Sequence, residues 1–389
     1  MHLESVDTPV AQKPAWTALR WDDYALLLIV LALTSLGIVV LLSSTYVLDS
    51  ADAFAMLKKQ AVWLVVASLA GLIAWRIDVH ELRDLVWWLA VPAILLCALV
   101  FIPPFGREIN GANRWLILGP FRFQVAEAVK VALVFILAHY LAENKRKLNE
   151  KIRGVIFPGL IIGVAFGMIL LQPDYGTAFL CALVGGCMLY LAGGALKYWV
   201  PLGILGLAGF ATLIYHNPER LSRVTSFLSL NSEVVRGDEG YQLWQGILGF
   251  ASGGMSGVGL GDGRQQITYL PEAHTDFIFS IVGEELGLIF TLLIVILFLA
   301  LFFLVALRIR RATSLYECLL VQGSLLFIVF QALINMGVVT GVLPTKGMSL
   351  PFISYGGSNL ILMFFFIGLI INVSSRWSAV PKRERVRSE

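Results

Sequence analysis

Long apolar runs recur along almost the whole chain, and they constrain its fold more than any other feature. A helix needs roughly 20 apolar residues to cross the hydrocarbon core of a bilayer. Hydrophobic residues make up 58% of the chain and charged residues 14%, whereas soluble domains carry roughly 25% charged residues. We therefore expect an all-α integral membrane protein of about ten transmembrane helices, at residues 24–44, 60–76, 86–102, 127–142, 155–171, 176–192, 198–215, 278–307, 316–340 and 358–374.

Only one connection between these runs is long. It covers about residues 216–277, between the seventh and eighth runs, and loops of that length in compact proteins are usually functional or disordered. We expect one polytopic membrane domain over residues 1–375 that includes this loop, followed by a basic tail at 376–389. The tail is most simply a solvated cytoplasmic end that lies near anionic membrane lipid.

The distribution of basic residues predicts the orientation of the chain. They concentrate in the even-numbered turns, and lysines and arginines of short loops favour the cytoplasmic side. Both termini are then cytoplasmic, and the segments 45–59, 103–123, 172–176, 216–277 and 341–357 lie outside. The basic residues of these turns are Arg76, Arg83, Lys145, Arg146, Lys147, Lys151, Arg153, Lys197, Arg308, Arg310 and Arg311.

Composition and spacing argue against three kinds of site. The net charge of +3 is too small to indicate nucleic-acid binding, and no basic stripe is interleaved with aromatics. The glycine run at 257–263 lacks the strand–turn–helix context of a dinucleotide site, and we interpret it as a turn that allows close backbone approach. The cysteines lie in or beside apolar runs, so they suggest neither disulfides nor a metal site: Cys97, Cys181, Cys187 and Cys318.

Polar residues collect near the expected outer face, where they are costly unless they are used. The richest stretch, 270–279, carries Glu272, His274 and Asp276 at the entrance to the eighth run, and Glu284 and Glu285 follow within two helical turns. Asp276 fits an N-cap or first-turn acid, which the helix dipole favours. It also fits a general base that takes a proton from a sugar hydroxyl. Glu272 and His274 either orient a substrate or a metal, or they are ordinary loop polarity.

A second polar group precedes and enters the fourth run. Arg114 and Trp115 are followed by Gln124, Glu127 and Lys130. Glu127 and Lys130 are three residues apart on a helix, so they can pair and lower each other's cost in the bilayer. Alternatively, Arg114 and Lys130 meet the pyrophosphate of a lipid-borne substrate, because fixed cationic donors stabilise such groups.

Two further segments interrupt the apolar pattern on the same side. Residues 341–358 contain prolines, glycines, Lys346 and Ser354, and non-helical backbone at this depth must be buried in protein or line a cavity. Lys346 lies outside against the positive-inside trend, so we expect it to have an anionic partner. In the short turn at 172–177, Asp174 either caps the next helix or lines the site.

Together these motifs resemble the SEDS family. They follow the family's order over residues 20–375: Arg114-Trp115 with Gln124, Glu127 and Lys130, QPDYGT at 172–177, SGGMSGVGLGDGRQQ at 252–266, LPEAHTDFIF at 270–279, GEELG at 283–287 and LPTKGMSLPFISYGGS at 343–358. LPEAHTDFIF and the LPTKG that opens the last motif resemble the division-specific branch more than the elongation-specific branch. The family's usual proline after Gln124 is Val125 here, which leaves that helix start less sharply defined and removes no reactive group.

The resemblance implies an inverting glycosyltransferase that joins the units of lipid II into peptidoglycan strands outside the cytoplasmic membrane, at the division septum. Asp276 would be its essential carboxylate. The cofactor it allows for is a divalent cation, Mg²⁺ or Mn²⁺, with no organic cofactor. Its partners would be a class B penicillin-binding protein and other divisome membrane proteins. The residues we expect to bind substrate are Arg114, Trp115, Glu127, Lys130, Glu272, His274, Lys346 and Ser354.

Two other functions fit the same pattern. A flippase for the lipid-linked precursor would also use helices broken near a polar cavity. The outward clustering of the carboxylates favours an enzyme over a flippase, which needs polar groups reachable from both faces. A scaffold that only recruits a polymerase would not need the Asp276 carboxylate at all.

Overall fold

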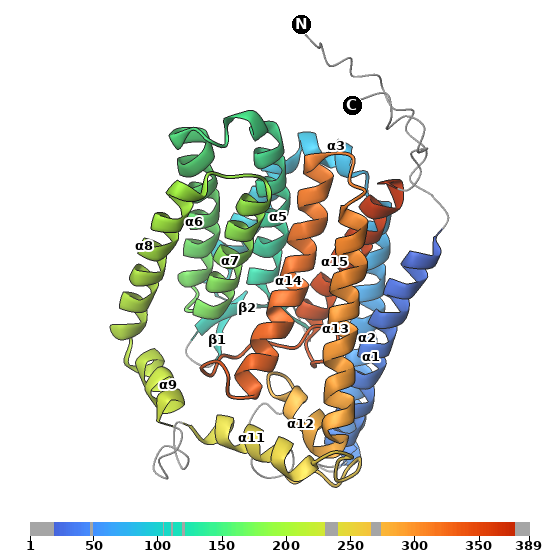
Figure 1. Ribbon diagram of the computed structural model, residues 1–389. Coiled ribbons are helices and arrows are strands. Elements are labelled where there is room, and N and C mark those ends of the chain that lie inside the picture. Colours follow the sequence, from blue (N-terminus) through green and yellow to red (C-terminus); the bar gives the residue numbers. More distant parts are fainter. Residues whose placement is uncertain are drawn as a thin grey trace, which may run out of the picture.

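The computed structural model describes residues 19–46, 50–103, 105–109, 112–118, 121–229, 240–265 and 274–377. Long helices run side by side through most of the molecule (Figure 1). They are α1 (Trp21–Tyr46), α2 (Ser50–Arg76), α5 (Val125–Glu143), α6 (Phe157–Leu170), α7 (Tyr175–Leu191), α8 (Leu196–Tyr215), α13 (Gly287–Ile309), α14 (Leu315–Val339) and α15 (Gly357–Trp377). The shorter helices are α3 (Val79–Asp84), α4 (Ala90–Leu99), α9 (Pro218–Leu228), α11 (Tyr241–Gly253) and α12 (Ile278–Glu285), with single turns at Val86–Leu89, Lys145–Lys147 and Ile152–Ile156.

Among the described residues, eight helical segments are long and apolar enough to cross a membrane. They are Trp21–Ser43, Met56–Arg76, Val125–Glu143, Ile152–Leu170, Leu196–Tyr215, Gly287–Ile309, Leu315–Val339 and Gly357–Trp377. Two shorter apolar helices, Val86–Leu99 and Tyr175–Leu191, occupy the positions of two further predicted runs. The chain is thus a helical multi-span membrane protein, and ten crossings remain a prediction.

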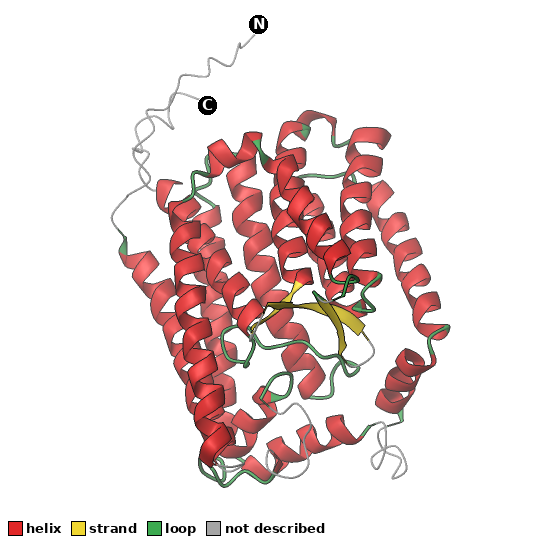
Figure 2. Ribbon diagram, turned by 180° about the vertical axis from the view of Figure 1, so that it is seen from behind, coloured by secondary structure: helices red, strands yellow, loops and turns green. Residues whose placement is uncertain are grey.

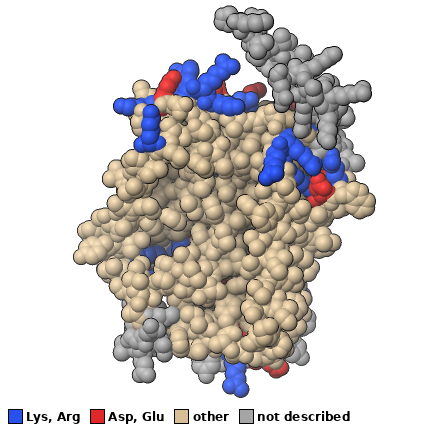
Figure 3. Space-filling view, viewed as in Figure 1, with Lys and Arg blue, Asp and Glu red and all other residues tan. Residues whose placement is uncertain are grey.

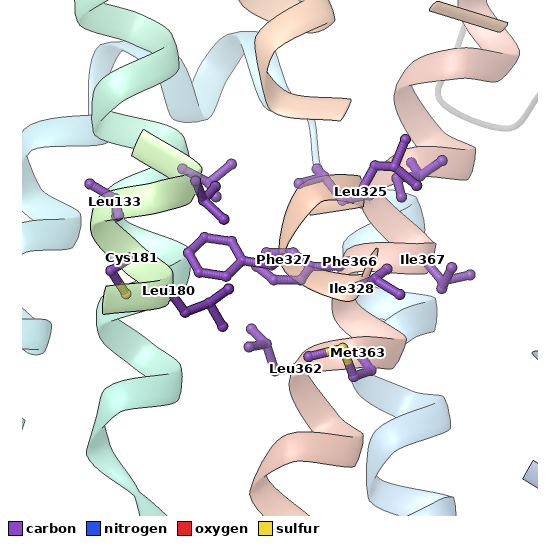
Figure 4. Packing of buried hydrophobic residues seen from close by; sticks show 14 of the residues in the cluster. Leu133, Leu180, Cys181, Leu325, Phe327, Ile328, Leu362, Met363, Phe366 and Ile367 are labelled. Atoms are coloured by element: carbon purple, nitrogen blue, oxygen red, sulfur yellow. The ribbon is translucent and has the colours of Figure 1, made fainter. Parts of the chain in front are cut away.

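The core lies where α5, α7, α14 and α15 meet. Phe327 of α14 and Phe366 of α15 stack with their ring centroids 5.8 Å apart, and Figure 4 shows apolar side chains from neighbouring helices around them. The helices α2 and α15 can approach closely because Gly368 has no side chain. A Cβ at that position would collide with the carbonyl of Gly71. By contrast, α8 lies at the edge of the bundle, where none of its span is buried.

The end of the bundle that carries α3 is held by a buried ion pair and a hydrogen bond. The Arg308 guanidinium donates to Asp23 Oδ1 at 2.6 Å and to Ser374 Oγ at 3.0 Å. These contacts bring the start of α1 together with the ends of α13 and α15. Lysine and arginine side chains gather at this end, the top of Figure 3. Which end faces the cytoplasm remains a prediction from that basic bias.

The predicted eighth run is wrong as a single helix, because it divides into α12 and α13. The break falls at Gly287, whose φ of +75° suits glycine, and a Cβ there would collide with the backbone of 255–257. The residues of α12 are all buried. Its Glu284 and Glu285 accept hydrogen bonds from the backbone N–H groups of Arg264, Gln265 and Gly261. The two carboxylates therefore hold the glycine-rich turn against the break.

A small antiparallel sheet departs from the all-α expectation. Its strands β1 (Gly106–Ile109), β2 (Ala112–Leu118) and β3 (Phe121–Gln124) pair in the order β1-β2-β3, where the sequence predicted an outer loop. Figure 2 shows the strands between the helices, in the half of the bundle away from α3. Trp115 pairs with Gln124 across β2 and β3. The sheet thus fixes the segment that precedes α5.

Candidate active site

The loop between α14 and α15, residues 340–356, is the first element of the candidate site. Leu350 and Phe352 anchor it in the core, and Phe352 has a left-handed φ of +66°. The Ser354 hydroxyl donates to the carbonyl of Thr275 at 2.6 Å and accepts the backbone N–H of Leu350 at 2.7 Å. The N–H of Tyr355 donates to the carbonyl of His274 at 3.0 Å. The loop therefore binds segment 274–276 through backbone groups, with Ser354 in a positioning role.

Asp276 lies directly against this loop. The Asn335 amide of α14 donates to the carbonyl of Asp276 at 2.7 Å and to the carbonyl of Met348 at 2.6 Å. A Cβ built on Gly347 would lie 2.6 Å from Oδ2 of Asp276, closer than such atoms approach. The half-buried carboxylate therefore packs on Gly347. The N-cap residue of α12 is Phe277, so Asp276 does not occupy the capping position that one interpretation of the sequence gave it.

Lys346, one residue before Gly347, has the anionic partner that the sequence predicted. Its ammonium lies 2.7 Å from Oδ1 of Asp174. The lysine stem crosses the first turn of α7 where a Cβ on Gly176 would collide with it, so that glycine makes room for the pair. The same Asp174 caps α7 by accepting the N–H of Thr177 at 3.2 Å. The capping interpretation of Asp174 is therefore confirmed, and its place in the site stays a prediction.

The two charges of this pair affect each other's protonation. Burial alone would raise the pKa of the Asp174 carboxyl, but the Lys346 ammonium and the charge of Arg114 hold it well below its usual range. Burial lowers the pKa of Lys346, and Asp174 offsets part of that shift. Asp174 is thus ionised at neutral pH and anchors a cation beside the Asp276 loop.

Glu127 and Lys130 form the predicted pair inside α5. Their side chains are 4% and 3% exposed, and Lys130 Nζ lies 2.9 and 3.1 Å from the two carboxylate oxygens. Lys130 also donates to Gln331 Oε1 at 3.1 Å, and the Gln331 amide donates to the carbonyl of Ser349 at 2.9 Å. All three donors of the ammonium are engaged. The pair is therefore connected to the α14–α15 loop through Gln331, which binds the carbonyl of Ser349.

The remaining predicted residues lie around this centre. Arg114 and Trp115 are half-buried on β2, and the charge of Arg114 reaches both Asp174 and Lys346. The ring of His274 lies edge-on to Tyr355, with centroids 6.2 Å apart. Glu272 lies outside the described residues. In the part of the chain that the structure describes, no group of three or more His, Cys, Asp and Glu side chains could hold a metal.

One residue near the centre escaped the sequence analysis. Arg220 of α9 donates to the carbonyl of Pro173 at 3.3 Å, and its guanidinium lies 5.2 Å from the ring centroid of Tyr175. It therefore covers the turn that holds Asp174. A signal was present, because Arg220 and Arg223 lie in a segment expected outside and oppose the positive-inside trend as Lys346 does.

A family model described as a cell cycle protein, FtsW/RodA/SpoVE, matches residues 24–378. A relative from Geobacter sp. (strain M18), called "Probable peptidoglycan glycosyltransferase FtsW", is 36% identical over 360 residues, which are 91% of this chain and 97% of the relative. A relative of the same name from Coxiella burnetii is 35% identical over 92% of this chain and 98% of its own length.

Two solved structures resemble the fold. One, described as "Structural coordination of polymerization and crosslinking by a peptidoglycan synthase complex", aligns with a TM-score of 0.77 and 28% identity over 94% of this chain and 100% of its own. The other is the rod shape determining protein RodA of Thermus thermophilus, with a TM-score of 0.69 and 27% identity over 93% and 98%.

Proposed function

Because the chain belongs to the FtsW/RodA/SpoVE family of cell cycle proteins, we propose that it is a peptidoglycan glycosyltransferase that polymerises lipid II. Membership in the SEDS family, inferred from the motifs, is thereby confirmed. The relatives named FtsW support a role in cell division, at the septum, over the elongation role of the sister branch. By the same analogy the protein works at the outer face of the cytoplasmic membrane.

The observation that carries the proposal is that opposite charges lie against one short loop. Gly347 packs against the Asp276 carboxylate, and the preceding Lys346 reaches Asp174 next to Arg114. Consecutive Cα atoms are only about 3.8 Å apart, so a base and a cationic region lie side by side. Glycosyl transfer from a lipid diphosphate needs that pairing, because one group loses a proton while another leaves with negative charge.

In the proposed reaction an acceptor sugar hydroxyl attacks the anomeric carbon of the donor. The new C–O bond forms as the bond between that carbon and the diphosphate oxygen breaks, and the electron pair leaves with the diphosphate. Asp276 takes the hydroxyl proton and Arg114 neutralises the departing diphosphate, while Lys346 stays paired with Asp174. Lys130 positions the loop from within α5 instead of meeting the substrate. A single displacement inverts the anomeric carbon and needs no nucleophilic side chain.

A divalent cation fits this site only in a limited way. Mg²⁺ is commonly held by one or two carboxylates together with substrate phosphates, not by a closed protein cage. Asp276 is the described carboxylate beside the loop that could serve as such a ligand, since Asp174 is already bound to Lys346. When bound, Mg²⁺ or Mn²⁺ would supply extra neutralisation of the diphosphate.

The likeness to a structure described as a peptidoglycan synthase complex supports a partner that crosslinks the product. We propose a class B penicillin-binding protein, accompanied by other divisome membrane proteins. The site end of this chain would face that partner's extracytoplasmic domain.

The decisive experiment uses purified full-length protein in detergent with lipid II. We expect wild type to form glycan strands and Asp276→Asn to bind lipid II without forming polymer. Asp262→Asn is the matched control, because it makes the same change to an exposed carboxylate in the glycine-rich turn. Normal polymer from Asp276→Asn would overturn the proposal. A flippase would make no glycan in detergent, where there is no membrane to cross.

A further inference from the structure

Three basic side chains lie around the Asp174 turn, and the charge of a fourth reaches one of them, Arg220; we call the four the basic cluster: Arg114, Arg220, Lys346 and Arg223. They come from β2, from α9 and from the loop after α14. Arg220 and Arg223 are three residues apart on α9 and so project from the same face. Figure 3 shows lysine or arginine side chains inside a hollow of the surface, well below the basic end of the bundle. Cations gathered at such a place require an anion.

The anion present in the chain is already saturated. A carboxylate has about four lone-pair sites. Oδ1 of Asp174 accepts from Lys346 at 2.7 Å and from the N–H of Thr177 at 3.2 Å. Oδ2 accepts from the Thr177 hydroxyl at 2.8 Å and from the Gln124 amide at 3.2 Å. All four sites are filled, so Asp174 has no hydrogen-bond acceptor left for Arg114 or Arg220.

Arg220 is held in place but not neutralised. One terminal nitrogen is engaged by Pro173, the guanidinium lies over Tyr175, and its buried Nε has no hydrogen-bond partner within the described ranges. Burial, and after it the charges of Arg223 and Arg114, lower the pKa of Arg220. Glu219, the carboxylate whose charge reaches Arg220, is exposed to solvent. A guanidinium fixed this way keeps donors for a ligand.

Arg114 also has free donors within the described part of the chain, although no polar side-chain contact there holds its guanidinium. Its side chain makes no hydrogen bond or ion pair with any described residue, although its charge reaches Asp174, Lys346 and Arg220. Two half-buried guanidinium groups that repel each other remain close because the sheet and α9 place them there. The natural ligand for two such planar donors is a polyphosphate, since guanidinium groups bind phosphate oxygens in pairs.

We propose that Arg220 and Arg114 together bind the diphosphate of the lipid-linked substrate, while Lys346 stays paired with Asp174 and orients the loop. This rests on the proposed function and adds Arg220 of α9 as a substrate-binding residue. Because Lys346 adjoins Gly347, the diphosphate bound at the cluster lies beside the loop that supports Asp276. The leaving group and the base would then flank the same anomeric carbon.

The test measures binding and turnover separately, on the full chain in detergent. The variants are Arg220→Gln and Arg220→Lys, the second of which keeps the positive charge but loses the planar guanidinium over Tyr175. Arg264→Gln is the matched control, because Arg264 is exposed in the glycine-rich turn. We expect Arg220→Gln to raise the KM for lipid II roughly tenfold or more, with a smaller change in kcat, because hydrogen bonds to charged groups are strong. Arg220→Lys should recover part of the loss and Arg264→Gln should match wild type.

Binding is measured with undecaprenyl diphosphate, inorganic pyrophosphate, undecaprenyl monophosphate and phosphatidylglycerol as separate probes, on the Asp276→Asn background. The proposal expects the two diphosphates to bind and to weaken on Arg220→Gln. Equal competition by phosphatidylglycerol would assign the cluster to bulk lipid headgroups and overturn it. If wild type polymerises lipid II but Arg220→Gln keeps the wild-type KM and diphosphate affinity, this inference fails and the proposed function stands. If diphosphate binding depends on Arg220 but wild type forms no glycan, this inference stands and the proposed function fails.

Discussion

The side chain of Asn335 fixes the backbone of Asp276. Its amide nitrogen lies 2.7 Å from the Asp276 carbonyl and 2.6 Å from the carbonyl of Met348, so one buried amide joins the carboxylate-bearing segment to the Lys346 loop. The side chain is 1% exposed, and its carbonyl oxygen has no hydrogen-bond partner among the described residues. Asn335 is thus a positioning residue that sets the distance between the base and the basic cluster.

Asn335→Ala should therefore lower kcat much more than it changes KM. It removes the amide donor from the part-buried Asp276 carbonyl and from the buried Met348 carbonyl, which costs about 1–3 kcal/mol for each group in stability. Steady-state polymerisation and thermal unfolding in detergent check the two effects. Asn335→Gln retains the amide on a longer side chain, so it should recover more of the lost stability than of the lost kcat. Unchanged kcat in a folded Asn335→Ala protein would show that the bridge does not position the carboxylate.

Gly347→Ala should displace the Asp276 carboxylate without removing any functional group. The added methyl would lie 2.6 Å from Oδ2, so the carboxylate must move. A misplacement of about 1 Å at a reacting group can cost roughly 100-fold in rate, and we expect a fall in kcat of that order. Gly356→Ala is the control in the same loop, because nothing lies within 4 Å of its added Cβ. Equal rates for the two variants would contradict the packing of Asp276 on Gly347.

The sequence predicted the parts of this site that depend on local spacing. The Glu127–Lys130 pair is three residues apart on one helix, and the capping by Asp174 needs only its own turn. The need of Lys346 for an anion followed from topology, but its partner lies 172 residues earlier in the chain, and no local pattern connects them. The same holds for Asn335, which reads as one polar residue in an apolar run.

Two errors have a common physical cause. The break between α12 and α13 and the sheet before α5 are both set by tertiary contacts, which hydropathy does not report. The glycine-rich turn packs on Gly287. Glu284 interrupts the apolar pattern of the run, and its carboxylate accepts hydrogen bonds from backbone N–H groups at the end of that turn. Hydropathy therefore located the segments correctly but could not show that the eighth begins as a short buried helix.

Separate and joint replacement of Lys346 and Asp174 should distinguish stability from function. Lys346→Met leaves a buried carboxylate without its cation, which we expect to cost about 3–5 kcal/mol. The double variant Lys346→Met/Asp174→Asn removes both charges and should recover much of that loss, because replacing both members of a buried pair is often nearly neutral. Its activity should stay low, since the loop loses its anchor. Thermal unfolding and polymerisation, measured on all the variants, check this.

Acid should reveal the ionisation of Asp174 through stability. Its folded pKa lies below the unfolded value of about 3.9, so its contribution is fully present above that value and is lost as the pH falls through the folded pKa. In acid Lys346 is charged in both the folded and the unfolded state, so it does not change how the free energy of unfolding depends on pH. Wild type and the double variant Lys346→Met/Asp174→Asn should therefore keep a constant stability difference from pH 6 down to about pH 4, and the difference should shrink in favour of the variant only below it. Unfolding measured by tryptophan fluorescence over that range checks the sign, because a gap that already closes between pH 6 and pH 5 would mean that burial, and not Lys346, dominates the carboxyl.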